Sequence, residues 1–294
     1  MRSIWLATLC LLGALSVAAP ARTPTAGPVE VFADGLAGPE GLAFTPSGTL
    51  VVGSTTGEIR SITADGRSTV LASVGDALAG VTVLRDGRVL ATAYGAGRVW
   101  SVEPDGTASV LASGVPGANF VVQTRERRLL VSSSPAGTIV DVTTGSPVEV
   151  ASGLSFPNGL AIGRTRALGK GRFLYVAETS ASRISRLPLG RDGSLGPPEV
   201  YATGLPIADG MAFDQKGNLM VVGGGKLHVV VARTREVVEL AADPPLDFPS
   251  NLAFGRGRGF RRRDMYLANF GPMLGDGTTV VRLRASNPGA PLVR

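Results

Sequence analysis

The heptapeptide Gly38-Pro39-Glu40-Gly41-Leu42-Ala43-Phe44 sets the pattern of the whole chain: a turn, an acidic residue, then a short apolar run. Variants of it return further along, with a different residue in the place of Glu40. They are Phe156-Pro157-Asn158-Gly159-Leu160-Ala161, Ile207-Ala208-Asp209-Gly210-Met211-Ala212-Phe213 and Phe248-Pro249-Ser250-Asn251-Leu252-Ala253-Phe254. A motif that returns at a regular period is typical of a repeat architecture. We therefore expect a repeated scaffold, in which the residues before the apolar runs form one shared site.

The period of the repeat predicts the architecture. Starting from Glu40, the equivalent positions are expected at Ala79, Ala118, Asn158, Asp209 and Ser250, and subtraction gives spacings of 39, 39, 40, 51 and 41 residues. Each unit contains short runs of Val, Ile, Leu and Thr separated by Asp-Gly and Ser-Gly turns, without the period of a helix. A period of roughly 40 residues with four strands is typical of a propeller blade. The sequence predicts an all-β protein, a six-bladed β-propeller.

The order of the strands predicts how the ring closes. Residues 29–32 resemble the outer strand of a blade, although they precede every inner strand, and the last unit ends at Val280-Val281-Arg282-Leu283 without an outer strand of its own. We expect residues 29–32 to pair with the strand around Val281, because this closure removes exposed sheet edges. The predicted propeller covers residues 29–285, and residues 286–294 form a C-terminal tail.

The first residues have the features of a secretory signal peptide. Arg2 precedes an apolar run over residues 4–17, and Ala19-Pro20-Ala21 fits a cleavage site. We expect residues 1–21 to be removed, residues 22–28 to form a linker, and the mature protein to be secreted or periplasmic, with no membrane span. The single cysteine, Cys10, lies in this segment, so the mature chain would contain no disulfide.

The charge of the chain suggests a nucleic-acid partner, which the composition argues against. The formal net charge is +6, but aromatic residues make up 5% of the chain and provide few platforms for stacking bases. We expect a small-molecule substrate, no nucleic acid, and a monomer. Two arginine-rich turns, residues 163–172 and 255–263, are expected on the face opposite Glu40, either as contacts for a polyanion or as solvated loops.

The residues that precede the inner strands of a propeller meet at one mouth of its channel. Here they include the carboxylates of Glu40 and Asp209 and the carboxamides of Asn119 and Asn158. Two carboxylates held together repel each other unless one takes up a proton or a cation lies between them. These oxygen ligands suit Ca²⁺, with Mg²⁺ or Mn²⁺ as competitors. The alternative is that Asn and Asp hydrogen-bond turns before glycine, although Glu40 is a poor turn residue.

Further residues are expected to complete this mouth. We assign Tyr94, Glu178, Asn251 and Phe270 to substrate binding, with Tyr94 and Phe270 as an apolar wall and Glu178 as a second acid. His228 belongs to a predicted third strand, away from the channel, and the sequence contains no Gly-x-Ser-x-Gly motif. Hydrolysis by a Ser-His pair is therefore excluded.

The chain resembles the superfamily of senescence marker protein, gluconolactonase and luciferin-regenerating enzyme, with paraoxonase and diisopropyl fluorophosphatase as more distant relatives. The resemblance spans the mature chain and is carried by Phe156-Pro157-Asn158-Gly159-Leu160-Ala161, Leu174-Tyr175-Val176-Ala177-Glu178-Thr179 and Asp209-Gly210-Met211-Ala212-Phe213-Asp214. It implies that Glu40, Asn158 and Asp209 bind a divalent metal. Asn119 matches a further Asn beside that metal, and we place it with Asp209 in the catalytic set.

The resemblance also implies hydrolysis of a lactone or related ester by metal-activated water, with Asp209 as general base. Two departures bear on the substrate. Gly117 stands where sugar lactonases carry an Arg that grips the substrate, and Asn119 lacks the following Asp-Gly. A less polar lactone or ester is therefore expected at least as readily as a sugar lactone. Two alternatives stay open: a non-catalytic propeller of the NHL kind that binds a ligand or partner, and a carbon–oxygen lyase resembling streptogramin lyase.

Overall fold

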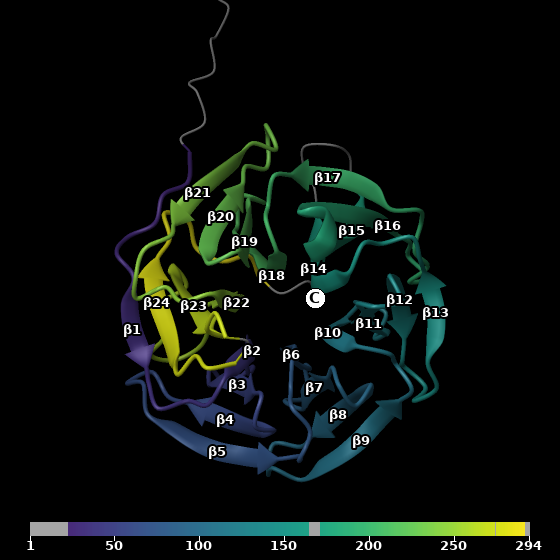
Figure 1. Cartoon of the computed structure of the whole chain (residues 1–294), viewed down its shortest axis with the longest axis horizontal. Coiled ribbons are helices and arrows are strands. Elements are labelled where there is room, and N and C mark those ends of the chain that lie inside the picture. Colours follow the sequence, from purple (N-terminus) through teal and green to yellow (C-terminus); the bar gives the residue numbers. More distant parts are fainter. Residues whose placement is uncertain (1–22, 165–170, 274, 292–294) are drawn as a thin grey trace, which may run out of the picture.

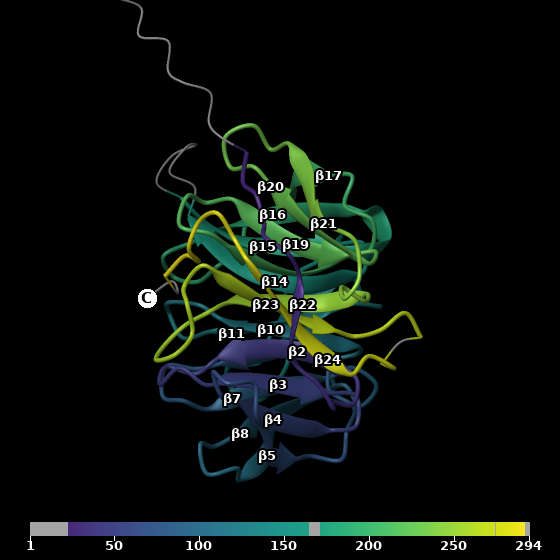
Figure 2. The same ribbon diagram turned by 90° about the vertical axis from the view of Figure 1, so that its left-hand side faces the viewer.

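The structure is a computed structural model, and it describes residues 23–164, 171–273 and 275–291. Within these residues the strands form six sheets of four strands each. Figure 1 shows the six sheets arranged as blades around a central axis, and Figure 2 shows their strands running between the two faces of the disc. The predicted all-β, six-bladed propeller is confirmed. None of the helices within the described ranges is long and apolar enough to cross a membrane.

Each blade is an antiparallel sheet whose strands follow one another from the channel outward. Blade 1 contains β2 (Pro39–Phe44), β3 (Leu50–Ser54), β4 (Glu58–Ile62) and β5 (Ser68–Ser73). Blade 2 contains β6 (Val81–Val83), β7 (Val89–Ala93), β8 (Arg98–Val102) and β9 (Ala108–Ser113). Blade 3 contains β10 (Ala118–Gln123), β11 (Leu129–Ser133), β12 (Thr138–Asp141) and β13 (Val148–Ala151).

The second half of the ring repeats this plan with longer strands in blade 4. Blade 4 contains β14 (Pro157–Arg164), β15 (Arg172–Glu178), β16 (Arg183–Leu189) and β17 (Glu199–Thr203), with a single 3₁₀ turn, η1 (Thr179–Ala181), after β15. Blade 5 contains β18 (Ala208–Phe213), β19 (Leu219–Gly223), β20 (Lys226–Val230) and β21 (Val237–Ala241). Blade 6 contains β22 (Pro249–Phe254), β23 (Asp264–Asn269), β24 (Thr279–Arg284) and β1 (Glu30–Ala33).

The ring closes through the first strand, as predicted. β1 pairs antiparallel with β24, with Glu30 opposite Arg282 and Val31 opposite Val281. The Arg282 Nη2 atom lies 2.9 Å from Glu30 Oε2 across this pair. The contact continues before β1, where the Gly27 N–H donates to the Arg284 carbonyl at 2.8 Å. Blade 6 therefore joins residues from both ends of the propeller in one sheet and leaves no blade incomplete.

The core lies between neighbouring blades. Every residue of the second strands β3, β7 and β19 is buried, because the two neighbouring blades cover the two faces of each sheet. One hydrophobic cluster joins Val51 and Ile59 of blade 1 to Val81 and Val89 of blade 2. Packing of this kind explains why the second strands have almost continuously apolar sequences.

One sequence-based equivalence was wrong by a single residue. Leu42 in blade 1 lies opposite Val52, and the corresponding pair in blade 3 is Val121 with Val131. Counting back two residues from Leu42 and Val121 makes Asn119, and not Ala118, the equivalent of Glu40. The sequence concealed this register because Phe120 follows Asn119, where blades 1, 2, 4 and 5 have glycine.

Some predictions fall on residues that the structure does not describe. The predicted signal peptide, residues 1–21, lies outside the described residues. So do residues 165–170 of the first arginine-rich turn and residues 292–294 of the predicted tail. The remainder of that tail is described, and it crosses the face opposite Glu40: the Ala290 N–H donates to the Phe213 carbonyl at 2.9 Å.

Candidate functional site

Four polar residues stand at the same height at the start of the inner strands. Glu40, Asn119, Asn158 and Asp209 are each the second residue of their strand, in β2, β10, β14 and β18. The structure thus brings together the four predicted metal ligands, which we call the oxygen ring. The charge of Glu40 also raises the pKa of Asp209, so the two carboxyl groups lie close enough to interact across the channel.

Glycine lets the inner strands of adjacent blades approach closely at the ring. A Cβ on Gly159 would lie 2.3 Å from the Asp209 carbonyl oxygen, and one on Gly41 would lie 2.4 Å from the Ala79 carbonyl oxygen. Either contact is far shorter than van der Waals packing allows, so a side chain there would push the blades apart. The glycine that follows Glu40 or Asn158 in the sequence therefore serves the assembly of the ring.

Hydroxyl groups from neighbouring strands fix the backbone of the ring. Ser250 Oγ donates to the Glu40 carbonyl at 2.8 Å, and Ser132 Oγ donates to the Asn158 carbonyl at 2.7 Å. Each hydroxyl comes from an adjacent blade, so the height of one ring residue is tied to the position of the next blade. The ring is rigid because the blades position one another.

The chain turns sharply just before the ring. Phe156 and Ile207 each stand two residues before a ring residue, and Phe248 stands two residues before Ser250, the equivalent position in blade 6; their φ angles are positive, at 56°, 50° and 44°. The turn directs a carbonyl at the neighbouring strand: the Thr179 N–H donates to the Phe156 carbonyl at 3.2 Å, and the Phe270 N–H donates to the Phe248 carbonyl at 3.3 Å. For a β-branched residue such as Ile207 this conformation costs about 1–3 kcal/mol. Local backbone strain is therefore concentrated beside the ring.

The two carboxyl groups of the ring resist ionising together. Burial raises the pKa of Glu40 to about 8. Burial, followed by the charge of Glu40, raises the pKa of Asp209 well above its ordinary value. Both side chains keep some contact with solvent because they border the channel. Protein surrounds them on most other sides, so few water molecules can reach their carboxyl groups. A positive charge between them would reverse both shifts.

Two amide oxygens of the ring are buried without a described hydrogen-bond donor. Asn119 Nδ2 donates to Ser134 Oγ at 3.1 Å, and Ser134 Oγ donates in turn to the Pro157 carbonyl at 2.7 Å. This chain of hydrogen bonds fixes the orientation of the Asn119 amide. Its Oδ1 atom and that of Asn158 are buried and receive no hydrogen bond from any described residue.

The ring is therefore a set of acceptors without donors, and its residues fit a hard cation. Two carboxylates and two amide oxygens match the oxygen ligands that Ca²⁺, Mg²⁺ or Mn²⁺ prefer. Within the described ranges, no three residues among His, Cys, Asp and Glu gather as a metal cluster, so the amides are needed to complete the ligand set. The alternative reading of Asn158 as a turn residue leaves its buried Oδ1 atom unexplained.

Two predicted substrate residues lie at the mouth above the ring. Tyr94 follows β7 and is 37% exposed, and Phe270 follows β23 and is partly buried. Tyr94 also covers Gly117, where a Cβ would lie 3.1 Å from Tyr94 Cε2 and 2.3 Å from Pro135 Cδ. Tyr94 and Pro135 thus occupy the space that a larger side chain at position 117 would need.

The assignment of Glu178 to substrate binding was wrong. Its side chain is 0% exposed, and its carboxylate accepts hydrogen bonds from the Ser155 N–H at 2.6 Å and from Arg183 Nε at 2.8 Å. Ser185 Oγ also donates to it. The carboxylate is fully used inside blade 4, which the sequence could not reveal because its partners come from across two hairpins.

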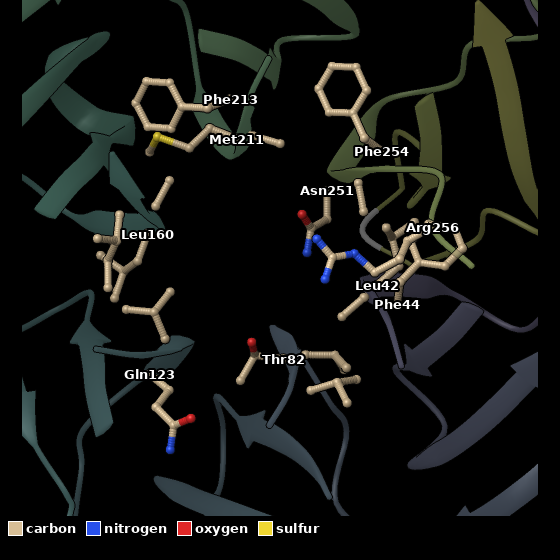
Figure 3. A pocket seen from close by; sticks show the side chains of 18 of the residues that line it. Leu42, Phe44, Thr82, Gln123, Leu160, Met211, Phe213, Asn251, Phe254 and Arg256 are labelled. Atoms are coloured by element: carbon tan, nitrogen blue, oxygen red, sulfur yellow. The ribbon is translucent and has the colours of Figure 1, made fainter. Parts of the chain in front are cut away.

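Asn251 lies one residue below the ring and belongs to a different region. It is 3% exposed and lines a cavity of about 570 Å³ that fills the other end of the channel. Figure 3 shows its amide pointing into that cavity. The expectation that Asn251 contributes to the same mouth as Tyr94 is therefore not supported.

The family of the chain follows from comparison with known proteins. The model of the SMP-30/Gluconolactonase/LRE-like region matches residues 114–269, which is more than half of the 294 residues. The chain therefore belongs to this family. A second model, of the strictosidine synthase-like N-terminal region, matches residues 30–62.

Individual relatives agree with this placement. Diisopropyl-fluorophosphatase of Loligo vulgaris is 30% identical over 119 residues, which is 38% of this chain and 37% of that protein, so the match covers little more than a third of the relative. Among solved structures, a gluconolactonase from Xanthomonas campestris has a TM-score of 0.69 at 19% identity, covering 90% of this chain and 98% of that one. Regucalcin from Agrobacterium tumefaciens, a calcium-binding protein, has a TM-score of 0.69 at 19% identity, covering 91% and 98%. At these identities the structures establish the shared fold.

Proposed function

We propose that this chain is a divalent-metal-dependent hydrolase of lactones or related esters of low polarity. The observation that carries the proposal is the oxygen ring. The carboxyl groups of Glu40 and Asp209 resist ionising together, and the buried amide oxygens of Asn119 and Asn158 lack donors among the described residues. One cation accounts for all of these features. Membership of a family that includes gluconolactonases supports hydrolysis as the reaction.

Glu40, Asn119, Asn158 and Asp209 would hold the ion, with Ca²⁺ preferred and Mg²⁺ or Mn²⁺ as competitors. When bound, such an ion supplies polarisation of a carbonyl group and a lowered pKa for water. The chain itself supplies position, because Ser134 holds the Asn119 amide and Ser250 holds the backbone of Glu40. Preorganised groups of this kind need no rearrangement during the reaction.

Asp209 is the residue that we assign to proton transfer. Its carboxylate belongs to the ring beside the place where the ion would bind, and Asp is one of the side chains that serve as general bases. It would accept the proton of the attacking water and return it to the leaving oxygen. Glu40 then contributes by balancing the charge of the ion.

The mouth favours a substrate of low polarity. Tyr94 and Pro135 close the space beside Gly117, which is where sugar lactonases resembling this chain carry an arginine. Ile207 is 44% exposed just before β18, and Phe270 follows β23 on the same face, so both add apolar side chains to this mouth. A hydrophobic lactone can bury its ring against these side chains, whereas a sugar lactone would lose hydrogen bonds to water without replacement.

The proposal is tested by combining thermal melting with a hydrolysis assay. Purified protein is melted with chelator or with millimolar Ca²⁺, Mg²⁺ or Mn²⁺, and assayed on an alkyl-substituted lactone and on gluconolactone. Binding to the native state adds about 2.7 kcal/mol of stability at a hundredfold excess over Kd, so we expect a clear rise in melting temperature. Glu40→Gln should lose both the rise and the hydrolysis. Asp105→Asn, in an exposed turn of blade 2, should lose neither.

Two outcomes would contradict the proposal. Melting that ignores every divalent cation at millimolar concentration would remove the metal site, and the hydrolase with it. A metal-dependent rise in melting temperature without turnover of either lactone class would also contradict it. That result would favour the competing function, a metal-binding propeller that holds a ligand without catalysis.

A further inference from the structure

Beyond the oxygen ring, the inner strands enclose a cavity of about 570 Å³. Phe44, Phe213 and Phe254 line it, and they are the last residues of β2, β18 and β22. Since the ring stands at the start of the inner strands, the cavity lies toward the opposite face of the disc. Its volume falls in the range of pockets that bind small molecules.

The wall of this cavity is mainly apolar, and Figure 3 shows Leu42, Leu160 and Met211 among the side chains around it. The described lining residues that have polar side chains are Thr82, Arg85, Gln123, Thr124, Asn251 and Arg256. Each of the two arginines already has an interaction partner, so neither indicates a charge on a ligand. A mainly apolar cavity favours a neutral ligand, because moving a charge out of water into it is costly.

One buried hydrogen-bond donor points into the cavity. The Leu252 N–H donates to Asn251 Oδ1 at 2.7 Å, and this contact identifies which atom of the amide is the oxygen. Figure 3 shows the amide pointing into the cavity. Asn251 is only 3% exposed, and its Nδ2 atom meets no acceptor from the part of the chain that the structure describes. A buried donor is unfavourable without an acceptor, so the cavity calls for an acceptor oxygen beside Asn251.

The surroundings of Asn251 favour an organic ligand over a single water molecule. A buried water needs about two to four polar partners. Leu252 follows Asn251 in β22, and Leu42 and Met211 stand at the equivalent fourth position of the inner strands in the two neighbouring blades. All three leucine and methionine side chains line the cavity. An oxygen that belongs to an apolar molecule would give Nδ2 its acceptor and cover these side chains at the same time.

We propose that this cavity binds a neutral, mainly apolar carbonyl compound, at a site separate from the oxygen ring. The carbonyl oxygen accepts the hydrogen bond from Asn251 Nδ2, and the apolar body of the ligand lies against Leu42, Leu160 and Met211. A carbonyl group fits better than a hydroxyl group, because the hydroxyl hydrogen would need an acceptor of its own. The site does not depend on the proposed hydrolysis, because none of the residues that line the cavity belongs to the ring.

Isothermal titration calorimetry with aryl ketones tests this assignment, because a ketone carries the carbonyl group but cannot be hydrolysed. Each buried methylene tightens binding by about fourfold, so butyrophenone should bind roughly 15-fold more tightly than acetophenone. Equal affinity for the two ketones would overturn the proposal. Tighter binding of 4-phenylbutanoate, a carboxylate of similar size, than of butyrophenone would also overturn it, since the ligand would then be an anion.

A comparison of a ketone with a hydrocarbon isolates the hydrogen bond to Asn251. α-Methylstyrene has the shape of acetophenone, with a methylidene carbon in place of the carbonyl oxygen. Asn251→Leu keeps the approximate volume and removes the donor, so it should weaken acetophenone binding at least about fivefold and leave α-methylstyrene binding within about twofold. An equal effect on both ligands would show that Asn251 makes no hydrogen bond to the ketone, and would contradict the proposal.

A second variant tests the place of binding and leaves Asn251 intact. Figure 3 shows Thr82 of β6 on the wall of the cavity, so an indole at this position takes up space that the ligand needs. Thr82→Trp should weaken the binding of both acetophenone and α-methylstyrene at least about tenfold. Arg67→Gln changes an exposed turn of blade 1 and should weaken neither. Unaltered binding by Thr82→Trp would show that the cavity is not the site.

A titration with and without chelator separates this site from the oxygen ring. Butyrophenone bound in the cavity should keep its affinity in the presence of chelator, because no ring residue contacts it. A ketone held by a metal ion at the ring would lose its affinity there, and that result would contradict the proposal. The lactone assay is independent of this titration, so either proposal can fail alone.

Discussion

The two ends of the central channel are built from the same inner strands and have opposite polar character. At the upper end, Asn119 and Asn158 present buried acceptor oxygens that no described residue satisfies, and two carboxyl groups join them. At the lower end, Asn251 presents a buried donor beside two arginines. The upper end therefore favours a cation, whereas the lower end is a mainly apolar cavity that contains one buried donor. The two ends differ although the same inner strands run between them.

The difference arises from position within the strand. The second residue of an inner strand points at the upper mouth, where the turn and the following glycine bring neighbouring blades into contact. The last residue reaches the lower opening, where blades diverge enough to leave a cavity walled by aromatic rings. Polar residues at the second position of the inner strands therefore lie close to one another. Residues further along these strands contact apolar side chains.

The largest effect is expected from Asp209→Asn. Losing a general base lowers the rate by about 10²- to 10⁴-fold, and the substitution also weakens the ion's binding site. We expect kcat/KM for an alkyl-substituted lactone to fall by at least about 100-fold at saturating Ca²⁺. Circular dichroism should show an unchanged fold. Hydrolysis within a few-fold of wild type would remove Asp209 from the reaction.

The two ends should also differ in their response to pH. The pKa of Glu40 is raised from 4.5 to about 8 in the folded protein, so the native state holds an extra proton between these values. Metal-free protein should then lose stability as pH rises from 5 to 8, at up to about 1.4 kcal/mol per pH unit from Glu40 alone, and the raised pKa of Asp209 adds to this slope. Melting temperatures in chelator measure this slope.

Two comparisons isolate the ring as the source of that slope. Glu40→Gln removes the proton of Glu40 and should make the dependence between pH 5 and 8 shallower, and the remaining slope belongs to Asp209, whose pKa is raised mainly by burial. Ca²⁺ stabilises the ionised pair, so wild type with Ca²⁺ should keep its stability over the same window. A metal-free wild type that becomes more stable from pH 5 to pH 8 would show that Glu40 is not protonated in the folded state.

A third acid shows how a structural carboxylate differs from those of the ring. Glu178 is buried against Arg183, Ser185 and the Ser155 N–H, and these partners lower its pKa despite its burial. Glu178→Gln leaves Arg183 with a weaker partner, and should cost about 3 kcal/mol in urea denaturation. KM for the lactone should stay within about twofold. A large rise in KM without loss of stability would contradict this structural role and indicate that Glu178 binds substrate.

The repeat made most of the fold predictable, and the exceptions have physical causes. The period, the Asp-Gly turns and the phase of β1 identify six blades and their closure, because local turn chemistry and strand pairing agree. The ring was predictable through Glu40, which is a poor turn residue, and through Asp209 at the equivalent position of another repeat. The register of blade 3 was not, since Phe120 replaces the expected glycine. The lower cavity was not predictable either, because its residues are ordinary strand residues that meet only after six blades have closed.

The smallest expected effect is a change in the free energy of unfolding from the strained backbone at Ile207, beside the upper end of the channel. Ile207 adopts a φ of 50° two residues before Asp209, and its side chain is 44% exposed, so little packing compensates the backbone strain. Ile207→Gly removes the Cβ that makes this conformation costly but adds freedom to the unfolded chain. The net change should be a gain of about 1 kcal/mol in urea denaturation, whereas Ile207→Val keeps the branched Cβ and should leave stability within about 0.5 kcal/mol. If the glycine variant is instead destabilised, the side chain of Ile207 contributes packing at the mouth that outweighs the strain. The apolar wall above the ring would then be part of the fold's stability as well as of substrate binding.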